Sequence, residues 1–155
     1  MASRRKGRIL AFQAIYSWEA SRAAKEAGIP EDLMNFSWLE DKREKLDEET
    51  ANFSRLLIAG VIENRKKIDA MIQKHLKNWD ISRINRVDLA ILRMSVYTLM
   101  FQSDLPPSIV IDEAIGIAKE YGADDSFRFI NGILDGIRKT LLQGERSGIS
   151  GLAGA

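Results

Sequence analysis

Apolar residues recur along most of this chain at the three- and four-residue spacing of a helix with one buried face. Ile9, Phe12 and Ile15 follow this spacing in a first helix predicted from about Arg5 to Ala20. β-Branched residues never alternate with polar ones for more than a few positions, so the pattern predicts no strands. The chain is therefore predicted to have an all-α fold.

The middle of the chain carries the strongest helical pattern. Residues 30–40 predict a short helix, and apolar positions from Asp47 to about Leu76 fit one long helix or two consecutive ones. Gly60 lies inside that pattern, and because glycine in a helix costs about 1 kcal/mol relative to alanine, we expect close packing or a break there. From Arg86 to Gln102, apolar residues cover nearly the whole circumference, so other helices must surround this segment.

Prolines and acidic residues delimit the last two predicted helices. The Pro106-Pro107 pair ends the central helix, because proline lacks a backbone donor and disfavours helix in the residue before it. The next helix is predicted from about Ser108 to Tyr121, with Gly122 placed to cap its end. Asp124 or Asp125 begins the last helix, since a carboxylate suits a helix N-terminus.

Length and composition indicate one compact domain. The chain has 155 residues, of which 45% are hydrophobic, enough to bury a single core. We divide it into a basic N-terminal arm at 1–8, a helical domain at 9–142 and a flexible tail at 143–155, where apolar residues are too sparse to pack. Since no run of eighteen apolar residues or apolar leader occurs, we expect a cytoplasmic protein that contacts no membrane.

The formal net charge of +1 conceals an uneven distribution of charge. Arg4, Arg5, Lys6 and Arg8 stand close together, with no acidic residue in the first eight positions. Such a cluster can neutralise nucleic-acid phosphates, and each contact adds to the affinity and to its salt dependence. The alternative is that these residues only keep a chain end soluble.

Signals for catalysis are weak. The acidic residues between Asp112 and Asp125 have no histidine or metal-binding motif beside them, so we interpret them as solvated helix faces and caps. His75 is the single histidine, and the absence of cysteine excludes disulfides and thiolate chemistry. No glycine-rich phosphate loop or nucleophile elbow occurs. We therefore predict no enzymatic activity, no cofactor and no metal.

The last predicted helix presents a second candidate surface. At about 100° per residue, Asp125, Phe129, Gly132 and Gly136 fall within about 60° of one another, away from the apolar stripe. An aromatic ring beside glycines can stack on a nucleic-acid base. The alternative is that the ring packs at the edge of a helix contact and the glycines permit a close crossing. Tyr16 leaves the same two alternatives open on the first helix.

Several stretches of the chain also occur in the order and spacing of a known family. They are Arg4–Arg8 leading into Ala11–Trp18, then Val87–Arg93, and finally Ile111–Lys119 with Gly122 and Phe129–Asp135. Together they resemble the NusB family of bacterial transcription antitermination factors. The chain departs from the family at Ile9 and Thr98, where glutamate is usual.

The resemblance implies an all-helical fold of two packed three-helix bundles with about seven helices. It implies a noncatalytic factor in transcription antitermination and termination that binds the boxA element of ribosomal RNA leader transcripts. The implied partners are NusE, a small-subunit ribosomal protein, and the antitermination complex on RNA polymerase. By position, the RNA-binding residues would be Arg4, Arg5, Lys6, Arg8, Tyr16, Asp125 and Phe129, and the NusE surface would include Asp88.

Two other interpretations come from different functional classes. The chain could be a helical adaptor that binds protein through its aromatic face. It could also be an RNA-positioning domain of the kind found in RNA cytosine methyltransferases, although it has no cysteine nucleophile and no glycine-rich cofactor motif. The sequence also leaves open whether the free protein is a monomer or a homodimer.

Overall fold

The computed structural model describes residues 3–21, 31–36, 38 and 46–153. Within these residues there are seven α-helices, one 3₁₀-helix and no strand, which confirms the predicted all-α fold. The elements are α1 (Arg4–Ala20), α3 (Glu31–Asn35), α4 (Glu48–Glu63), α5 (Arg65–Lys74), η1 (Ile81–Arg83), α6 (Arg86–Phe101), α7 (Pro107–Tyr121) and α8 (Ser126–Ala153).

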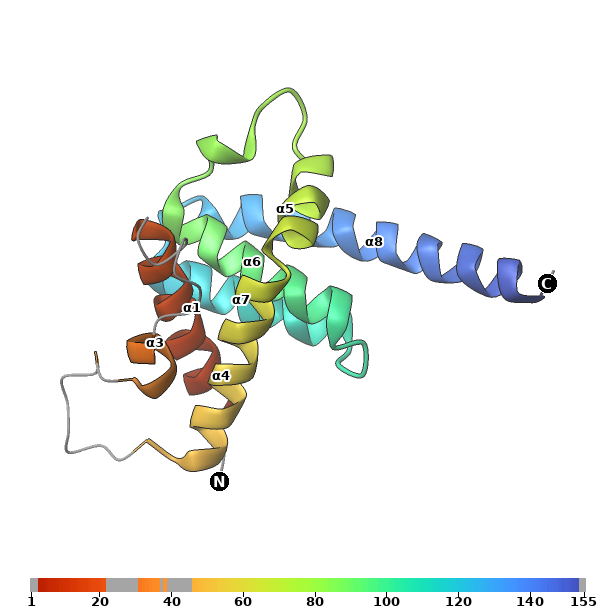
Figure 1. Cartoon of the computed structure of the whole chain (residues 1–155). Coiled ribbons are helices and arrows are strands. Elements are labelled where there is room, and N and C mark those ends of the chain that lie inside the picture. Colours follow the sequence, from red (N-terminus) through yellow and green to blue (C-terminus); the bar gives the residue numbers. More distant parts are fainter. Residues whose placement is uncertain (1–2, 22–30, 37, 39–45, 154–155) are drawn as a thin grey trace.

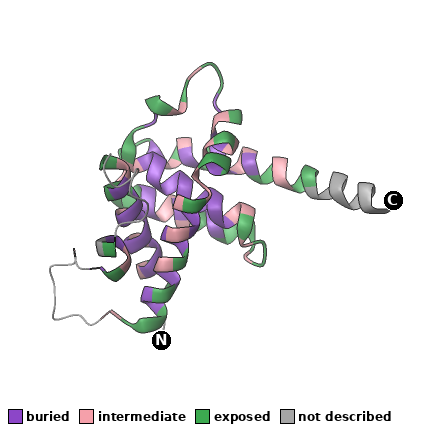
Figure 2. Cartoon of the chain, in the orientation of Figure 1, coloured by how far each residue is buried: buried purple, intermediate pink, exposed green. Residues whose placement is uncertain are grey.

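Helix α6 lies at the centre of the molecule (Figure 1). Every residue from Asp88 to Thr98 is buried, as the fully apolar circumference predicts. Helices α1 and α4 pack on α6 and on each other, and α7 and α8 do the same, while α5 also contacts α6. The two expected groups of three helices therefore share α6, and buried positions concentrate on the faces turned toward it (Figure 2).

The segment from Asp47 to Leu76 forms two consecutive helices, and the break between them lies at Asn64. Gly60 lies inside α4, at the point where α4 and α6 come close together. A Cβ atom at Gly60 would lie 2.2 Å from Cζ of Tyr97 on α6. Close packing against Tyr97 therefore explains the glycine at position 60. The break between α4 and α5 lies elsewhere, at Asn64.

A buried arginine joins three helices. The guanidinium of Arg93 on α6 donates two hydrogen bonds to Asp69 on α5, each 2.9 Å long, and one of 2.7 Å to Glu19 on α1. Burial alone would lower the pKa of Arg93, yet the hydrogen bonds and negative charges of Asp69 and Glu19 raise it above its usual value. This triad fixes the C-terminal end of α1 against the central helix.

The two ends of the predicted helical domain are both helical. Helix α1 begins at Arg4, close to the start predicted at about Arg5, so the described residues of the basic arm from Arg4 onward form its first turns. Helix α8 continues to Ala153 and extends past the other helices, because no proline ends it after Leu142 (Figure 1). Residues 154–155 lie outside the described residues, and the mobility expected for the tail stays a prediction. In the described part of the chain, none of the helices has the length and apolar character that crossing a bilayer requires.

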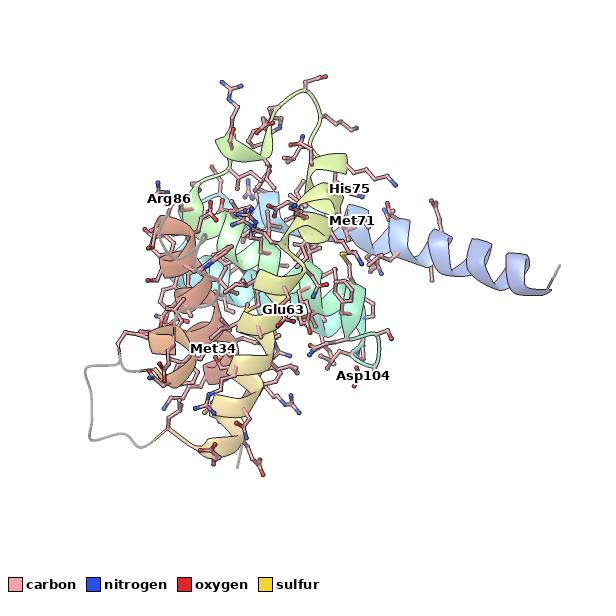
Figure 3. The ribbon with its side chains drawn as sticks, viewed as in Figure 1. Met34, Glu63, Met71, His75, Arg86 and Asp104 are labelled. Carbon is pink, nitrogen blue, oxygen red and sulfur yellow. The ribbon has the colours of Figure 1, made fainter. Side chains whose placement is uncertain are left out.

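The only histidine connects α5 to α8 (Figure 3). His75 Nε2 lies 3.0 Å from Oγ1 of Thr140. Its Nδ1 would lie 2.9 Å from a Cβ atom at Gly136, so the imidazole packs directly on the α8 backbone. Burial, and then the positive charge of Lys74, lowers the pKa of His75 from its ordinary value of 6.5.

We predict that His75 titrates with a midpoint below 6.5 in the folded protein. Because the unfolded chain takes up this proton near pH 6.5 while the folded chain resists it, stability should fall as the pH drops from 6.5 through the folded-state pKa. An NMR titration of the imidazole Cε1 proton measures the midpoint without ambiguity, since there is one histidine. The same resonance in urea provides the unfolded control, and equal midpoints in the two states would contradict the prediction.

Candidate nucleic-acid interface

The first turn of α1 is basic. Arg4, Arg5 and Lys6 occupy it without an acidic residue, and Ser3 caps the helix by accepting a 3.2 Å hydrogen bond from the Lys6 N–H. The N-terminal end of a helix carries a partial positive charge, which adds to the charge of these side chains. This end of the molecule is therefore suited to binding phosphate.

Two of the four predicted basic residues face an aromatic ring on α4. The guanidinium carbon of Arg4 lies 4.4 Å from the centroid of the Phe53 ring, and that of Arg8 lies 5.5 Å from it. Arg8 is only 7% exposed, and its Nη1 lies 3.9 Å from Oε2 of Glu113 on α7. Burial lowers the pKa of Arg8, and this effect outweighs the negative charge of Glu113, which raises the pKa. Arg8 thus packs α1 against its neighbours, and its assignment to RNA stays a prediction.

Two contacts join α1 to the last turn of α7. Arg5 forms a 2.9 Å ion pair with Glu120, in which both side chains are about half exposed. Phe12 and Tyr121 pair with ring centroids 5.4 Å apart. Tyr16 lies one turn after Phe12 on the same side of α1 and is 39% exposed. The basic first turn and the exposed Tyr16 therefore belong to one helix, α1, which contacts α7 through Arg5 and Phe12.

A tight corner joins α7 to α8. Gly122 donates its N–H to the carbonyl of Ala118, as a helix-capping residue does, but its backbone is extended. Glycine is needed because a Cβ there would lie 2.7 Å from that carbonyl oxygen. The buried Ser126 hydroxyl accepts a 3.0 Å hydrogen bond from the Ala123 N–H. Asp125 is left exposed at the start of α8, and its carbonyl accepts the N–H of Phe129.

The corner contains an aromatic residue that the sequence analysis did not select. Phe127 is half-buried, with Lys119 Nζ 5.0 Å and the Arg128 guanidinium carbon 5.5 Å from its ring centroid. The Phe-Arg-Phe sequence at the helix start was an available signal, because it places aromatic rings on two sides of α8. We define the α7–α8 corner by Lys119, Asp125, Phe127, Arg128 and Phe129.

The face of α8 that the sequence left unassigned is divided between packing and exposure. Phe129 is half-buried and pairs with Trp79, with ring centroids 5.6 Å apart and planes tilted by 41°. Gly136 meets His75, whereas Gly132 is exposed and has open space around it. The packing alternative therefore explains part of this face. Phe129 still keeps a partly accessible ring beside the exposed Asp125.

Asp88, the residue predicted to face NusE, lies buried in the first turn of α6. It is 5% exposed, and it exchanges two hydrogen bonds with Asn85: the Asp88 N–H donates to Oδ1 of Asn85, and the Asn85 amide donates to Asp88 Oδ2. This arrangement caps the helix. Its Oδ1 is buried without a hydrogen-bond partner in the described part of the chain. The contact with NusE stays a prediction.

The last turn of α7 connects the two candidate surfaces. Glu120 binds Arg5 of α1, and its neighbour Lys119 lies over Phe127 of α8. These two contacts thus link charged and aromatic side chains from the start of α1 to the start of α8. Among the residues that the structure describes, no three histidine, aspartate or glutamate side chains gather as metal ligands would. The fold and this surface define a class: an all-helical protein with a cationic, aromatic surface suited to nucleic acid.

Comparison with known sequences narrows this class. Residues 5–139 match the family described as the NusB family. The transcription antitermination protein NusB of Treponema denticola is 50% identical over 135 residues, which are 87% of this chain and 95% of that protein. The chain therefore belongs to the NusB family. The relatives are named as antitermination proteins and not as enzymes, in agreement with the prediction of a noncatalytic protein.

Solved structures agree with this assignment. NusB of T. maritima has a TM-score of 0.75 and 36% sequence identity, covering 90% of this chain and 93% of that chain. A structure of the antitermination factors NusB and NusE in complex with dsRNA has a TM-score of 0.74 and 25% identity, covering 88% of this chain and 96% of that chain. The predicted helical architecture is thus that of NusB proteins.

Proposed function

We propose that this protein is a noncatalytic, cytoplasmic transcription antitermination factor that binds the boxA element of ribosomal RNA leader transcripts together with NusE. The observation that carries the proposal is that charged and aromatic side chains are linked from α1 through α7 to α8 by the Arg5–Glu120 ion pair and the Lys119–Phe127 contact. Similarity to a NusB that was solved with NusE and dsRNA supports it.

Each group has a distinct role in this proposal. Arg4, Arg5 and Lys6 bind phosphates and set the position of the strand. Tyr16 and Phe129 stack on bases of unpaired RNA, which aromatic side chains do without strong sequence preference. The exposed carboxylate of Asp125 accepts hydrogen bonds from base amino groups, as carboxylates do from cytosine. Asp88 marks the NusE side, and the complex acts on RNA polymerase.

Neutralising the basic first turn should reduce the salt dependence of RNA binding. Each phosphate contact to a single strand contributes about 0.7 to the slope of log K against log salt, so Arg4→Gln/Arg5→Gln should reduce the slope by about 1.4. Filter binding of boxA RNA over a salt series measures it. The control variant Arg138→Gln/Lys139→Gln removes two cations that pair with Asp135 on α8 and should leave the slope unchanged. Equal slopes for all three proteins would refute the phosphate role.

A comparison of RNAs separates the proposed factor from a protein adaptor. An antitermination factor should bind boxA RNA more tightly than a scrambled sequence of the same length, and NusE should strengthen the binding. An adaptor would bind both RNAs equally weakly. Sizing the free protein in the same buffer shows whether it is a monomer or a homodimer before RNA is added.

A further inference from the structure

The end of α8 extends past the surface on which the rest of that helix packs. Helix α8 has 28 residues, and its last turns, after Leu142, project beyond the other helices (Figure 1). The side chain of Leu142 is 50% exposed. A Cβ atom added at Gly144 would meet no other part of the described chain within 4 Å. Among the described residues, α8 therefore has no packing partner from Gly144 onward.

Glycines make this extension costly as an isolated helix. Gly144, Gly148 and Gly151 all lie within it, and each glycine in a helix costs about 1 kcal/mol relative to alanine. Helices in proteins owe most of their stability to packing, which has to offset such a cost. Earlier in α8, the close approach of His75 accounts for Gly136, whereas Gly144 has open space. A second backbone that comes close to α8 would account for a glycine at position 144.

An apolar pocket of about 360 Å³ lies at the base of the extension. Its apolar lining comes from α6, α7, the connection between them and α8, and consists of Leu99, Leu105, Pro107, Leu141 and Leu142. Arg138 is the cation of the lining, and it already forms a 2.6 Å ion pair with Asp135. The pocket is therefore suited to apolar side chains rather than to an anion.

The chain itself supplies apolar side chains of the required size. Ile149 and Leu152 are the two large apolar residues that follow Leu142 in the sequence. Leu152 lies ten residues beyond Leu142, about 15 Å further along a continuous helix. Because α8 leads away from the pocket up to Ala153, these residues do not reach the pocket of their own chain. They can reach the same pocket on a second copy.

We infer that two copies of this chain form a homodimer in which the ends of the two α8 helices pair antiparallel and each end covers the pocket of the other copy. Such an interface is isologous, since both copies use the same surface. With the two-fold axis at Ser147, Leu152 of one copy lies opposite Leu142 of the other, and Gly148 lies beside the axis, where the two backbones are closest. Leu142 is thirteen residues, or about 20 Å, along α8 from Phe129. The interface therefore goes beyond the proposed RNA surface and does not depend on it.

Sedimentation of the full-length protein over a range of concentrations tests the inference. The mass should rise with concentration from the 17.5 kDa of one chain to twice that value. Leu142→Lys should weaken the dimer at least about tenfold, because it places a charge in an apolar contact. Leu56→Lys is the matched control, since Leu56 on α4 is 52% exposed, and it should dimerise as the wild type does.

A charge-pair rescue tests the antiparallel arrangement. Leu152→Glu should weaken the dimer as Leu142→Lys does, although the two positions are ten residues apart. The double variant Leu142→Lys/Leu152→Glu places opposite charges face to face at both ends of the interface, and it should dimerise more tightly than either single variant. If the double variant recovers nothing, the antiparallel pairing is wrong.

Other results would also overturn the inference. They are a wild type that stays monomeric at every concentration, and a dimer that both single variants leave unchanged. If Leu142→Lys weakens the dimer and Leu152→Glu does not, another segment covers the pocket and the end of α8 is not its occupant. RNA binding enters none of these measurements, so their failure leaves the proposed function untouched.

Melting temperatures distinguish a lost interface from a lost fold. The side chain of Leu142 is half exposed in one chain, so Leu142→Lys should melt as the wild type does when both are dilute enough to be monomeric. At high concentration the wild type should melt at a higher temperature than Leu142→Lys, because dimerisation stabilises the folded state by mass action. An equal concentration dependence in the two proteins would contradict the interface.

Discussion

Replacing Arg93 with alanine is expected to lower the free energy of unfolding by about 3 kcal/mol. Removing one partner of a buried ion pair typically costs about 3–5 kcal/mol, because the other charges stay behind without compensation. Here Arg93 is 5% exposed at its side chain, whereas Glu19 and Asp69 keep 21% and 24%, so water can partly solvate the two carboxylates. The lower end of the range is therefore expected. For a chain of this size the melting temperature should drop by roughly 10 °C, which thermal denaturation followed by circular dichroism measures.

Two comparisons separate the triad from a simple loss of side-chain volume. Arg138→Ala removes an exposed ion pair with Asp135 and should change stability by less than about 0.5 kcal/mol. The triple variant Arg93→Met/Asp69→Asn/Glu19→Gln removes all three charges and should recover most of the stability, because no charge is left unpaired. If Arg93→Ala loses no more than Arg138→Ala, the buried triad does not hold α1 against α5 and α6.

Hydrophobic periodicity predicted the helices well because the burial of one helix face requires apolar residues at a regular spacing along the sequence. The segment from Arg86 to Gln102 was expected to be surrounded, and α6 is the helix that all the larger elements pack on. Gly60 was expected to mark a close approach or a break, and the ring of Tyr97 shows the close approach. Both features follow from local rules of helix propensity and pattern.

Side-chain roles were harder to predict, because they depend on residues far away in the chain. Arg8 belongs to a cluster that looks uniformly exposed, yet Phe53 and Glu113 enclose it from two other helices. Phe129 looked unused by the core, yet Trp79, fifty positions earlier, covers part of its ring. Asp88 received a partner role by resemblance, which stays a prediction, and the sequence did not indicate its two hydrogen bonds with the N-cap residue Asn85. No periodicity in a single sequence reports such contacts.

The α7–α8 corner gives the opposite case, in which the structure adds residues that the sequence did not indicate. Tyr16, Asp125 and Phe129 were selected by resemblance and by angular position on a helix. Phe127 and Lys119 were not selected, since their contact joins the end of one helix to the start of the next. The spatial arrangement therefore enlarges the predicted surface from separate residues to a connected one.

Phe129→Ala is expected to reduce affinity for boxA RNA by about 5- to 150-fold, the equivalent of the roughly 1–3 kcal/mol that one stacked base contributes. The ring also pairs with Trp79, so the variant should lose about 0.5–1.5 kcal/mol of stability as well. Filter binding well below the melting temperature measures the affinity. Phe129→Leu keeps apolar volume against Trp79 but removes the aromatic face, and it should bind RNA as weakly as the alanine variant while melting closer to the wild type.

An aromatic residue outside the proposed surface provides the matched control. Phe101 at the end of α6 is 42% exposed and pairs with Tyr97 at 5.4 Å, much as Phe129 pairs with Trp79. Phe101→Ala should therefore destabilise the fold to a similar extent and leave RNA affinity unchanged. Equal losses of affinity in both alanine variants would show that destabilisation explains the effect. Wild-type affinity in Phe129→Leu would mean that this side chain contributes packing alone, and the base contacts of the protein would then have to come from Tyr16 or from other residues of the α7–α8 corner.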